Sequence, residues 1–282
     1  MNFFDDDSLR LPVSTHIVFD IETGPAWHPG DSVEAAKAYC QPLGIDYDPA
    51  SIGPHPGEFD PFSVKLGNLK DPEKREAKIK DARENHASLI SLHEAKAIGG
   101  EQSSWESIID NAALSPITGS VLAIGFSQHG SCTIVNAAAD TDESTILKLW
   151  WRAFELARGE SQKLIGWNIA NFDIPFLVWR SAAMGVEIPR GVYRGKWLSD
   201  SFVDLMDRWG RMYDPWKGQQ SGSVQAKRIA RFLGCSRPAD EIEGKDFWRH
   251  FLGSESERSI AIRYLENDVT EETIIAKRLG VI

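Results

Sequence analysis

The segment HIVFDIETG, residues 16–24, combines a predicted buried strand with the first two candidate site residues. Residues 15–21 are rich in β-branched and apolar side chains, which predicts a buried strand that the following Gly-Pro pair should stop. Asp20 and Glu22 are two residues apart, so in a strand both side chains point to the same face of the sheet. The two carboxylates can therefore share a bound ion.

Two further apolar segments also have an acid at one end: GWNIANFDIPF contains Asp173 and RYLENDVTEET contains Asp268. Ionised carboxylates buried together cost several kcal/mol each unless cations neutralise them. Mg²⁺ and Mn²⁺ prefer oxygen ligands, and one or two carboxylates usually hold each ion. Two such ions can stabilise the attacking and the leaving oxygen of a phosphoryl displacement. Together the four acids predict a centre for two Mg²⁺ or Mn²⁺ ions that hydrolyses phosphodiesters.

The composition is that of a globular chain, because 282 residues with 42% apolar content can bury a sizeable core. No apolar run approaches the roughly 20 residues that a membrane helix needs, and the acidic start MNFFDDDSLR lacks the basic region of a signal peptide. Cys40, Cys132 and Cys235 lie far apart and are interpreted as reduced, structural thiols. We expect a soluble protein of the cytoplasm.

Residues 26–115 interrupt the pattern and are interpreted as an insertion within a single domain of residues 1–282. The insertion combines Pro- and Gly-rich segments with a charged helix predicted from about Asp71 to Ile98. Asp71 and Pro72 are typical of a helix start, and pairs such as Glu76 with Lys80 support the helix at i,i+4. We expect this insertion to cover the site or to dock a partner.

Strands and helices alternate over the rest of the chain, which predicts an α/β fold. Strands are expected at residues 115–127 and 131–137, joined around Gly130, and at residues 163–168. Helices are expected at residues 144–158, 173–184, 222–233 and 256–279.

The acidic segments resemble the motifs of a known superfamily, the DEDD 3′–5′ exonucleases, and in particular the proofreading domains of family-B DNA polymerases. FDIETG (19–24) resembles the first motif and GWNIANFDIPFL (166–177) the second, while Tyr264 and Asp268 form the Y-x-x-x-D pattern of the tyrosine subgroup. The resemblance covers roughly residues 15–25 and 116–280. It implies a ribonuclease-H-like fold with a mixed central sheet, flanking helices and a large insertion after the first strand.

The resemblance also implies roles for the motif residues. Asp20, Glu22, Asp173 and Asp268 would hold two metal ions, with Asp20 bridging them. Tyr264 lies one helical turn before Asp268, so its hydroxyl can reach the metal site and orient the attacking water. The expected reaction is release of nucleoside 5′-monophosphates from the 3′ end of single-stranded DNA, in a bacterial or phage-infected cell. A separate DNA polymerase or other replication proteins are further partners that the resemblance suggests, and no membrane is expected.

Candidate substrate-binding residues come from the motifs and from a basic stretch. Although the net charge is −10, residues 190–237 hold ten basic against four acidic side chains, a local charge of +6 by 10 minus 4. Basic surface supplies most of the non-specific affinity for nucleic acid, and exposed aromatic rings stack unpaired bases. The candidates are Thr23, Asn168, Phe172, Lys227, Arg228 and Arg231, with Trp197, Trp209 and Trp216 as rings expected to be exposed.

Simpler structural roles remain open for many of these residues, among them Asn168, whose side chain could bond only to local backbone. Asp20 and Glu22 could cap a turn at the strand end, and Asp173 could be the N-cap of the following helix. Asp268 could belong to a solvated helix face together with Glu266, Glu271 and Glu272. Tyr264 could be an ordinary core aromatic, the cations of residues 227–231 a solvated face, and Asp204 a structural or supporting residue.

Two other functions also stay open. Nothing in the motifs reads a 2′-hydroxyl, so an exoribonuclease acting on short RNA is an alternative to a DNA exonuclease. A catalytically idle module that binds nucleic acid or replisome proteins is the other. The presence of all four acids and the tyrosine favours an enzyme.

Overall fold

The computed structural model describes residues 16–28, 30–128, 131–136, 142–213, 225–235 and 242–282. The chain divides into two compact units, one formed by Met1–Ala26 with Ala112–Ile282 and the other by Trp27–Asn111. The second unit falls inside the segment 26–115 that the sequence indicates as an insertion.

The described residues of the first unit contain a five-stranded mixed sheet in the order β3-β2-β1-β4-β7. β1 pairs antiparallel with β2 and parallel with β4, while β3 adds antiparallel to β2 and β7 adds parallel to β4. The strands are β1 (His16–Pro25), β2 (Gly119–Gln128), β3 (Ser131–Asn136), β4 (Lys163–Gly166) and β7 (Phe202–Asp204). The sheet confirms the predicted α/β class, whereas Gly130, the expected turn between β2 and β3, lies outside the described residues.

β1 runs further than the sequence predicts, because it continues through Gly24 to Pro25 instead of stopping there. Gly24 pairs with Ser120 of β2, and the register between the two strands shifts after Glu22. A Cβ atom at Gly24 would lie 2.6 Å from the Leu122 side chain. The glycine therefore permits close packing inside the sheet and does not end the strand.

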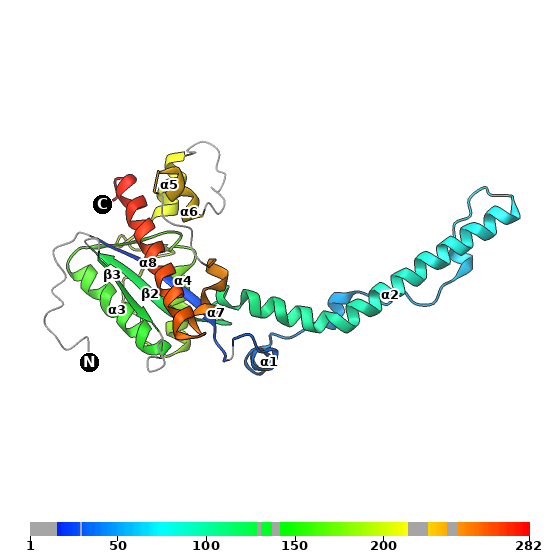
Figure 1. Cartoon of the computed structure of the whole chain (residues 1–282), viewed down its shortest axis with the longest axis horizontal. Helices are drawn as coiled ribbons and strands as arrows, with labels where there is room; N and C mark the ends of the chain where they lie inside the picture. Colours follow the sequence, from blue (N-terminus) through cyan, green and yellow to red (C-terminus); the bar gives the residue numbers. More distant parts are fainter. Residues whose placement is uncertain (1–15, 29, 129–130, 137–141, 214–224, 236–241) are drawn as a thin grey trace. The chain divides into compact units, whose positions relative to one another are not determined.

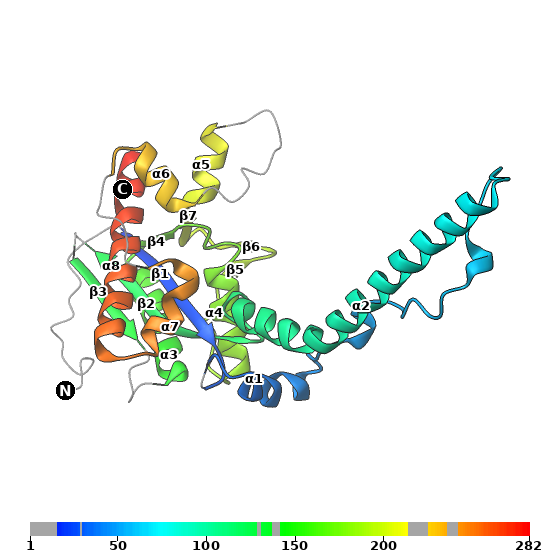
Figure 2. The same cartoon turned by 45° about the vertical axis from the view of Figure 1, so that its right-hand side comes forward.

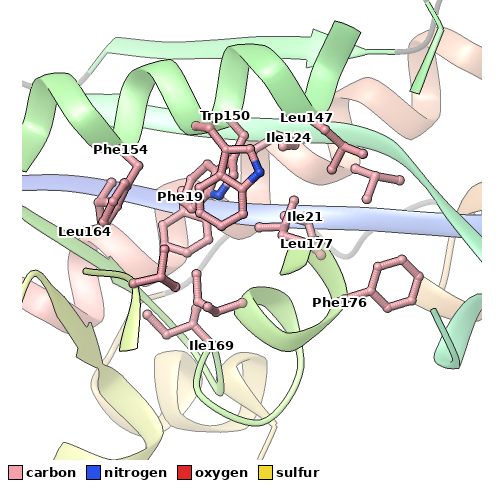
Figure 3. Close-up of a cluster of buried hydrophobic side chains, with 14 of the residues drawn as sticks. Phe19, Ile21, Ile124, Leu147, Trp150, Phe154, Leu164, Ile169, Phe176 and Leu177 are labelled. Atoms are coloured by element: carbon pink, nitrogen blue, oxygen red, sulfur yellow. The ribbon is translucent and has the colours of Figure 1, made fainter. Parts of the chain in front are cut away.

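One face of the sheet is covered by α3 (Glu143–Gly159) and α4 (Asp173–Ala183). Figure 3 shows the apolar cluster between them, in which Phe19 and Ile21 of β1 meet Trp150 of α3 and Leu177 of α4. The Phe19 and Trp150 rings are 4.5 Å apart between centroids. Since side chains alternate along a strand, the residues between these positions point to the opposite face. That face receives Asp20 and Glu22.

The opposite face of the sheet is covered by α8 (Glu255–Arg278), which packs against β1, β2 and β3 (Figures 1 and 2). The helix begins with a capping box between Ser254 and Glu257. Gly125 of β2 lies opposite Asp20, and a Cβ atom there would be 2.7 Å from Val269. The missing side chain lets α8 approach the sheet closely enough to reach the acids of β1.

Shorter elements complete the first unit: β5 (Tyr193–Arg194), β6 (Trp197–Leu198), α5 (Leu205–Tyr213), α6 (Ala226–Phe232), α7 (Phe247–Phe251), and the 3-10 helices η4 (Ala112–Leu114) and η5 (Gly244–Asp246). α6 is shorter than the predicted helix 222–233, of which residues 222–224 lie outside the described part. The remaining elements span two to nine residues each and are too short for periodicity to reveal.

The second unit contains α1 (Val33–Cys40), the 3-10 helices η1 (Gln41–Leu43), η2 (Pro49–Ile52) and η3 (Pro61–Ser63), and the long helix α2 (Pro72–Asn111). Asp71 Oδ1 accepts hydrogen bonds from the backbone N–H groups of Glu73 and Lys74, at 3.0 and 3.4 Å, which confirms the predicted helix start. Lys80 Nζ lies 4.0 Å from Glu84 Oε1, an ion pair with the i,i+4 spacing.

The predicted end of α2 at Ile98 is wrong, because the helix passes through Gly99 and Gly100 to Asn111. α1 packs against α2, with Lys37 in an ion pair with Glu101 and 5.8 Å from the centroid of the buried Trp105 ring. This packing outweighs the low helix propensity of the two glycines. Among the described residues, none of the helices combines the length and apolar character that a membrane span needs.

Candidate metal centre

Two of the acidic motifs meet where α8 crosses β1. One carboxylate oxygen from each of Asp20, Glu22 and Asp268 lies within 4.8 Å of the others. Asp20 and Glu22 come from the same face of β1, as their spacing predicts, and Asp268 comes from the middle of α8. The three side chains are half-buried, so they do not form a fully solvated acidic face.

Asp173 is the first residue of α4, and its neighbour Phe172 occupies the N-cap position. The hypothesis that Asp173 is the N-cap is therefore wrong. The residue is 2% exposed, and burial raises its pKa more than the nearby backbone N–H groups of Asp173 and Ile21 lower it. Within the described part of the chain its Oδ1 atom has no hydrogen-bond partner. The negative charge of Asp173 raises the pKa of Asp20, which places the two acids in one electrostatic cluster.

The loop between β4 and α4 is held in place by Asp204, at the end of β7. Asp204 Oδ1 accepts from the Asn168 N–H at 3.0 Å, and its Oδ2 accepts from the Ala170 N–H at 2.9 Å. Asn168 has a positive φ of 60°, a conformation that asparagine tolerates better than most residues. Asp204 thus supports the loop that delivers Asp173 to the site.

Glu272 is a buried acid, although the sequence pattern of acids on this helix indicates a solvated face. It lies one helical turn beyond Asp268, is 4% exposed and accepts a hydrogen bond from the backbone N–H of Trp167. Among the described residues its Oε2 atom has no hydrogen-bond partner. The i,i+4 spacing from Asp268 is the sequence signal that could have revealed it.

The electrostatics of this cluster favour a bound cation. Burial, followed by the charges of neighbouring acids, raises the pKa of Asp20, Glu22 and Glu272 well above its ordinary value. Burial raises the pKa of Asp173 to about 7. Buried carboxylates with raised pKa values and unsatisfied oxygens form an all-oxygen donor set of the kind that hard divalent cations prefer. The residues present therefore fit a divalent metal.

Tyr264 and Lys227 complete the cluster. Lys227 Nζ, from α6, donates to Tyr264 Oη at 2.7 Å and lies 3.5 Å from Asp268 Oδ1. The Tyr264 ring packs 6.2 Å from the Phe247 ring, so the residue is both a core aromatic and a member of the site. Burial, then the charges of Asp268, Glu22 and Asp20, raises the pKa of Tyr264. Its hydroxyl therefore stays protonated at neutral pH.

The three cations predicted together on α6 have different surroundings. Lys227 is half-buried and turned toward the acids, whereas Arg228 and Arg231 are exposed. Packing of α6 against α8 accounts for the inward position of Lys227. The basic surface offered by this helix therefore consists of the two arginines.

The other predicted substrate-binding residues have partners within the fold. Thr23 is buried and its Oγ1 donates to the Ala113 carbonyl at 2.7 Å, while Asn168 Oδ1 accepts from Asn171 at 3.0 Å. Phe172 packs against the apolar core. Their contact with a substrate stays a prediction. Trp197 is 70% exposed, Trp209 is half-buried and Trp216 lies outside the described residues.

The family of the chain follows from a sequence comparison. A family model of the RNase_H superfamily matches residues 109–279, more than half of the chain, and the protein belongs to this superfamily. The matched part contains Asp173, Tyr264 and Asp268, and the pairing of β1 with β2 and β4 adds Asp20 and Glu22 to it. The predicted ribonuclease-H-like fold is thereby confirmed.

Among solved structures, the chain is similar to the family B DNA polymerase from the hyperthermophilic archaeon Pyrobaculum calidifontis, with 18% sequence identity and a TM-score of 0.49. The similarity covers 60% of this chain and 23% of the polymerase chain. The protein thus spans less than a quarter of that polymerase. A comparison with curated proteins gives no match.

Proposed function

We propose that the protein is a metal-dependent 3′–5′ exonuclease that hydrolyses single-stranded DNA to nucleoside 5′-monophosphates. The observation that carries the proposal is the gathering of carboxylate oxygens from Asp20, Glu22 and Asp268 within 4.8 Å of one another. Asp173 is buried in the same electrostatic cluster. Membership of the RNase_H superfamily supports a nuclease. The acidic motifs follow the same order as in the DEDD 3′–5′ exonucleases that they resemble, and this resemblance supports the 3′–5′ direction.

In this proposal Asp20, Glu22, Asp173 and Asp268 hold two Mg²⁺ or Mn²⁺ ions. When bound, the ions supply positive charge at the scissile phosphate and promote ionisation of water. The protonated hydroxyl of Tyr264 has a fixed position, because it donates to Asp268 and accepts from Lys227. It can therefore hold the attacking water in line with the phosphorus. The ammonium group of Lys227 adds positive charge beside the same carboxylates.

Tyr264→Phe tests the positioning role of the hydroxyl. The ring and its packing are kept, so we expect an unchanged melting temperature and a turnover that is slower by about 10²-fold, the usual cost of a misplaced reacting group. Single-turnover rates at saturating DNA, together with the Kd for DNA in chelator, separate turnover from binding. A loss as large as that caused by removing a metal-ligating acid would contradict the positioning role.

Arg228 and Arg231 are proposed to contact phosphates of the single strand. Replacing both by Gln should weaken binding and reduce the slope of log K against log salt by about 0.7 for each lost phosphate contact. Turnover at saturating DNA should stay within about two-fold, because both side chains are exposed, whereas the acids are buried or half-buried. Lys277→Gln, an exposed cation near the end of α8, is the matched control. An unchanged salt slope in the double variant would contradict the docking role.

The activity itself is tested with matched DNA and RNA oligomers that carry a 5′ label. Wild-type protein in Mn²⁺ or Mg²⁺ should give a ladder that shortens from the 3′ end of the DNA, and chelator should abolish it. Faster degradation of the RNA would instead indicate an exoribonuclease. Binding of the oligomer without degradation in either metal would indicate an interaction module and overturn the proposal.

A further inference from the structure

The acid Glu272 lies outside the four-acid set of the motifs. We propose that Glu272 is an additional carboxylate of the metal centre, a positioning residue whose negative charge strengthens binding of the divalent ions. The inference rests on the proposed metal centre and deepens it, because it names a residue that sets the affinity for metal.

The placement of Glu272 brings its carboxylate next to the acids of the site. It follows Asp268 by four residues on α8, which puts both side chains on one face of the helix. A Cβ atom at Gly166 would lie 3.5 Å from Glu272 Oε2 and 2.6 Å from the Phe19 carbonyl oxygen. The carboxylate therefore lies at the end of β4, beside the backbone of β1 immediately before Asp20. Glycine at position 166 leaves room for the Phe19 carbonyl oxygen and the Ile169 side chain, and Glu272 Oε2 lies at an ordinary contact distance from the same point.

One oxygen of the Glu272 carboxylate is free to contact a cation, while a backbone N–H group acts on the carboxylate. The backbone N–H of Trp167 donates to the carboxylate, at the start of the loop that ends at Asp173. Oε2 has no hydrogen-bond partner in the described part of the chain, although the residue is 4% exposed. An unsatisfied, buried carboxylate oxygen is destabilising unless a cation or a metal-bound group compensates it. The charges of Asp20, Asp173 and Asp268 act on Glu272, so a cation bound among these acids would compensate this oxygen.

A purely structural role makes a different prediction. If Glu272 only satisfied the Trp167 N–H, a glutamine would serve equally well, because its side-chain carbonyl oxygen accepts the same hydrogen bond. Glu272→Gln removes the charge and keeps the shape. The variant therefore tests the contribution of the charge alone, because the packing and the hydrogen bond are kept.

The experiment is calorimetric titration of Mn²⁺ into the metal-free full-length protein. Glu272→Gln should raise the Kd for Mn²⁺ by about 10–100-fold, as loss of a supporting group around a metal does. Its melting temperature without metal should equal or exceed that of the wild type. Glu266→Gln, an exposed acid on the same helix, should bind Mn²⁺ like the wild type. Wild-type affinity in Glu272→Gln would overturn the inference.

A second variant keeps the test decisive if Glu272→Gln folds poorly. Glu272→Asp retains the charge on a shorter side chain and should bind Mn²⁺ more tightly than the glutamine variant, whereas equal weakening would show that shape matters and not charge. Calorimetry requires no turnover. If the wild type binds Mn²⁺ and Glu272→Gln loses affinity while no DNA is hydrolysed, the proposed function fails and the role of Glu272 stands. A wild type that binds no Mn²⁺ overturns both.

Discussion

Replacement of Asp20 by alanine is expected to lower the rate of DNA hydrolysis by about 10³-fold or more, which corresponds to several kcal/mol of lost transition-state stabilisation. The charge of Asp20 interacts with those of Asp173, Asp268 and Glu272. Its loss should therefore impair the whole centre. The measurement is the single-turnover rate in saturating Mn²⁺ with a 5′-labelled oligomer.

The fold of Asp20→Ala should survive, because the substitution removes one of several half-buried or buried like charges and leaves the apolar face of β1 unchanged. We expect its melting temperature without metal to equal or exceed that of the wild type. Glu266→Ala, an exposed acid on α8, is the control and should keep wild-type activity. Retention of activity in Asp20→Ala would contradict the assigned role, and a collapsed melting temperature would indicate that Asp20 supports the fold instead.

The second large effect is the dependence of stability on metal and pH. Burial raises the pKa of Asp173 from its ordinary value of 3.8 to about 7, and the pKa values of Asp20, Glu22 and Glu272 also rise. The folded protein then holds protons that the unfolded chain has released. For Asp173 the resulting stabilisation is fully present below about pH 3.8 and is lost as the pH rises through about 7. Without metal, stability should fall between pH 5 and about pH 7.5.

Bound metal should reverse this loss, because it neutralises the ionised carboxylates. At a free Mn²⁺ concentration of about 100 times the Kd the gain is about 2.7 kcal/mol, which raises the melting temperature by about 5–10 °C. Thermal melts at pH 5 and 7.5, with chelator and with Mn²⁺, measure both effects. The Mn²⁺-induced rise should be larger at pH 7.5. A melting temperature that does not change with Mn²⁺, or stability that increases with pH in chelator, would contradict metal binding by these carboxylates.

Much of the site could be predicted because short spacings translate directly into geometry. The two-residue interval between Asp20 and Glu22 puts both on one face of β1, and the four-residue interval between Tyr264 and Asp268 puts both on one face of α8. Neither interval depends on the rest of the fold. The same argument applied to Asp268 and Glu272 would have found Glu272, but the neighbouring acids at positions 266 and 271 made the segment look solvated.

The features that could not be predicted depend on contacts distant in sequence. Lys227 belongs to a run of cations, and only the packing of α6 against α8 turns it toward the carboxylates. The end of α2 depends on packing around the buried Trp105, which outweighs the glycine pair before it. Asp204 holds the loop before Asp173 through backbone hydrogen bonds to residues about 35 positions away along the chain.

The metal ions can be located directly by anomalous diffraction at the manganese edge from crystals of the protein grown with Mn²⁺. The proposed metal centre should give two manganese peaks bounded by the carboxylates of Asp20, Glu22, Asp173 and Asp268, with Glu272 facing them. Manganese bound elsewhere in the crystal, with none at these carboxylates, would contradict it.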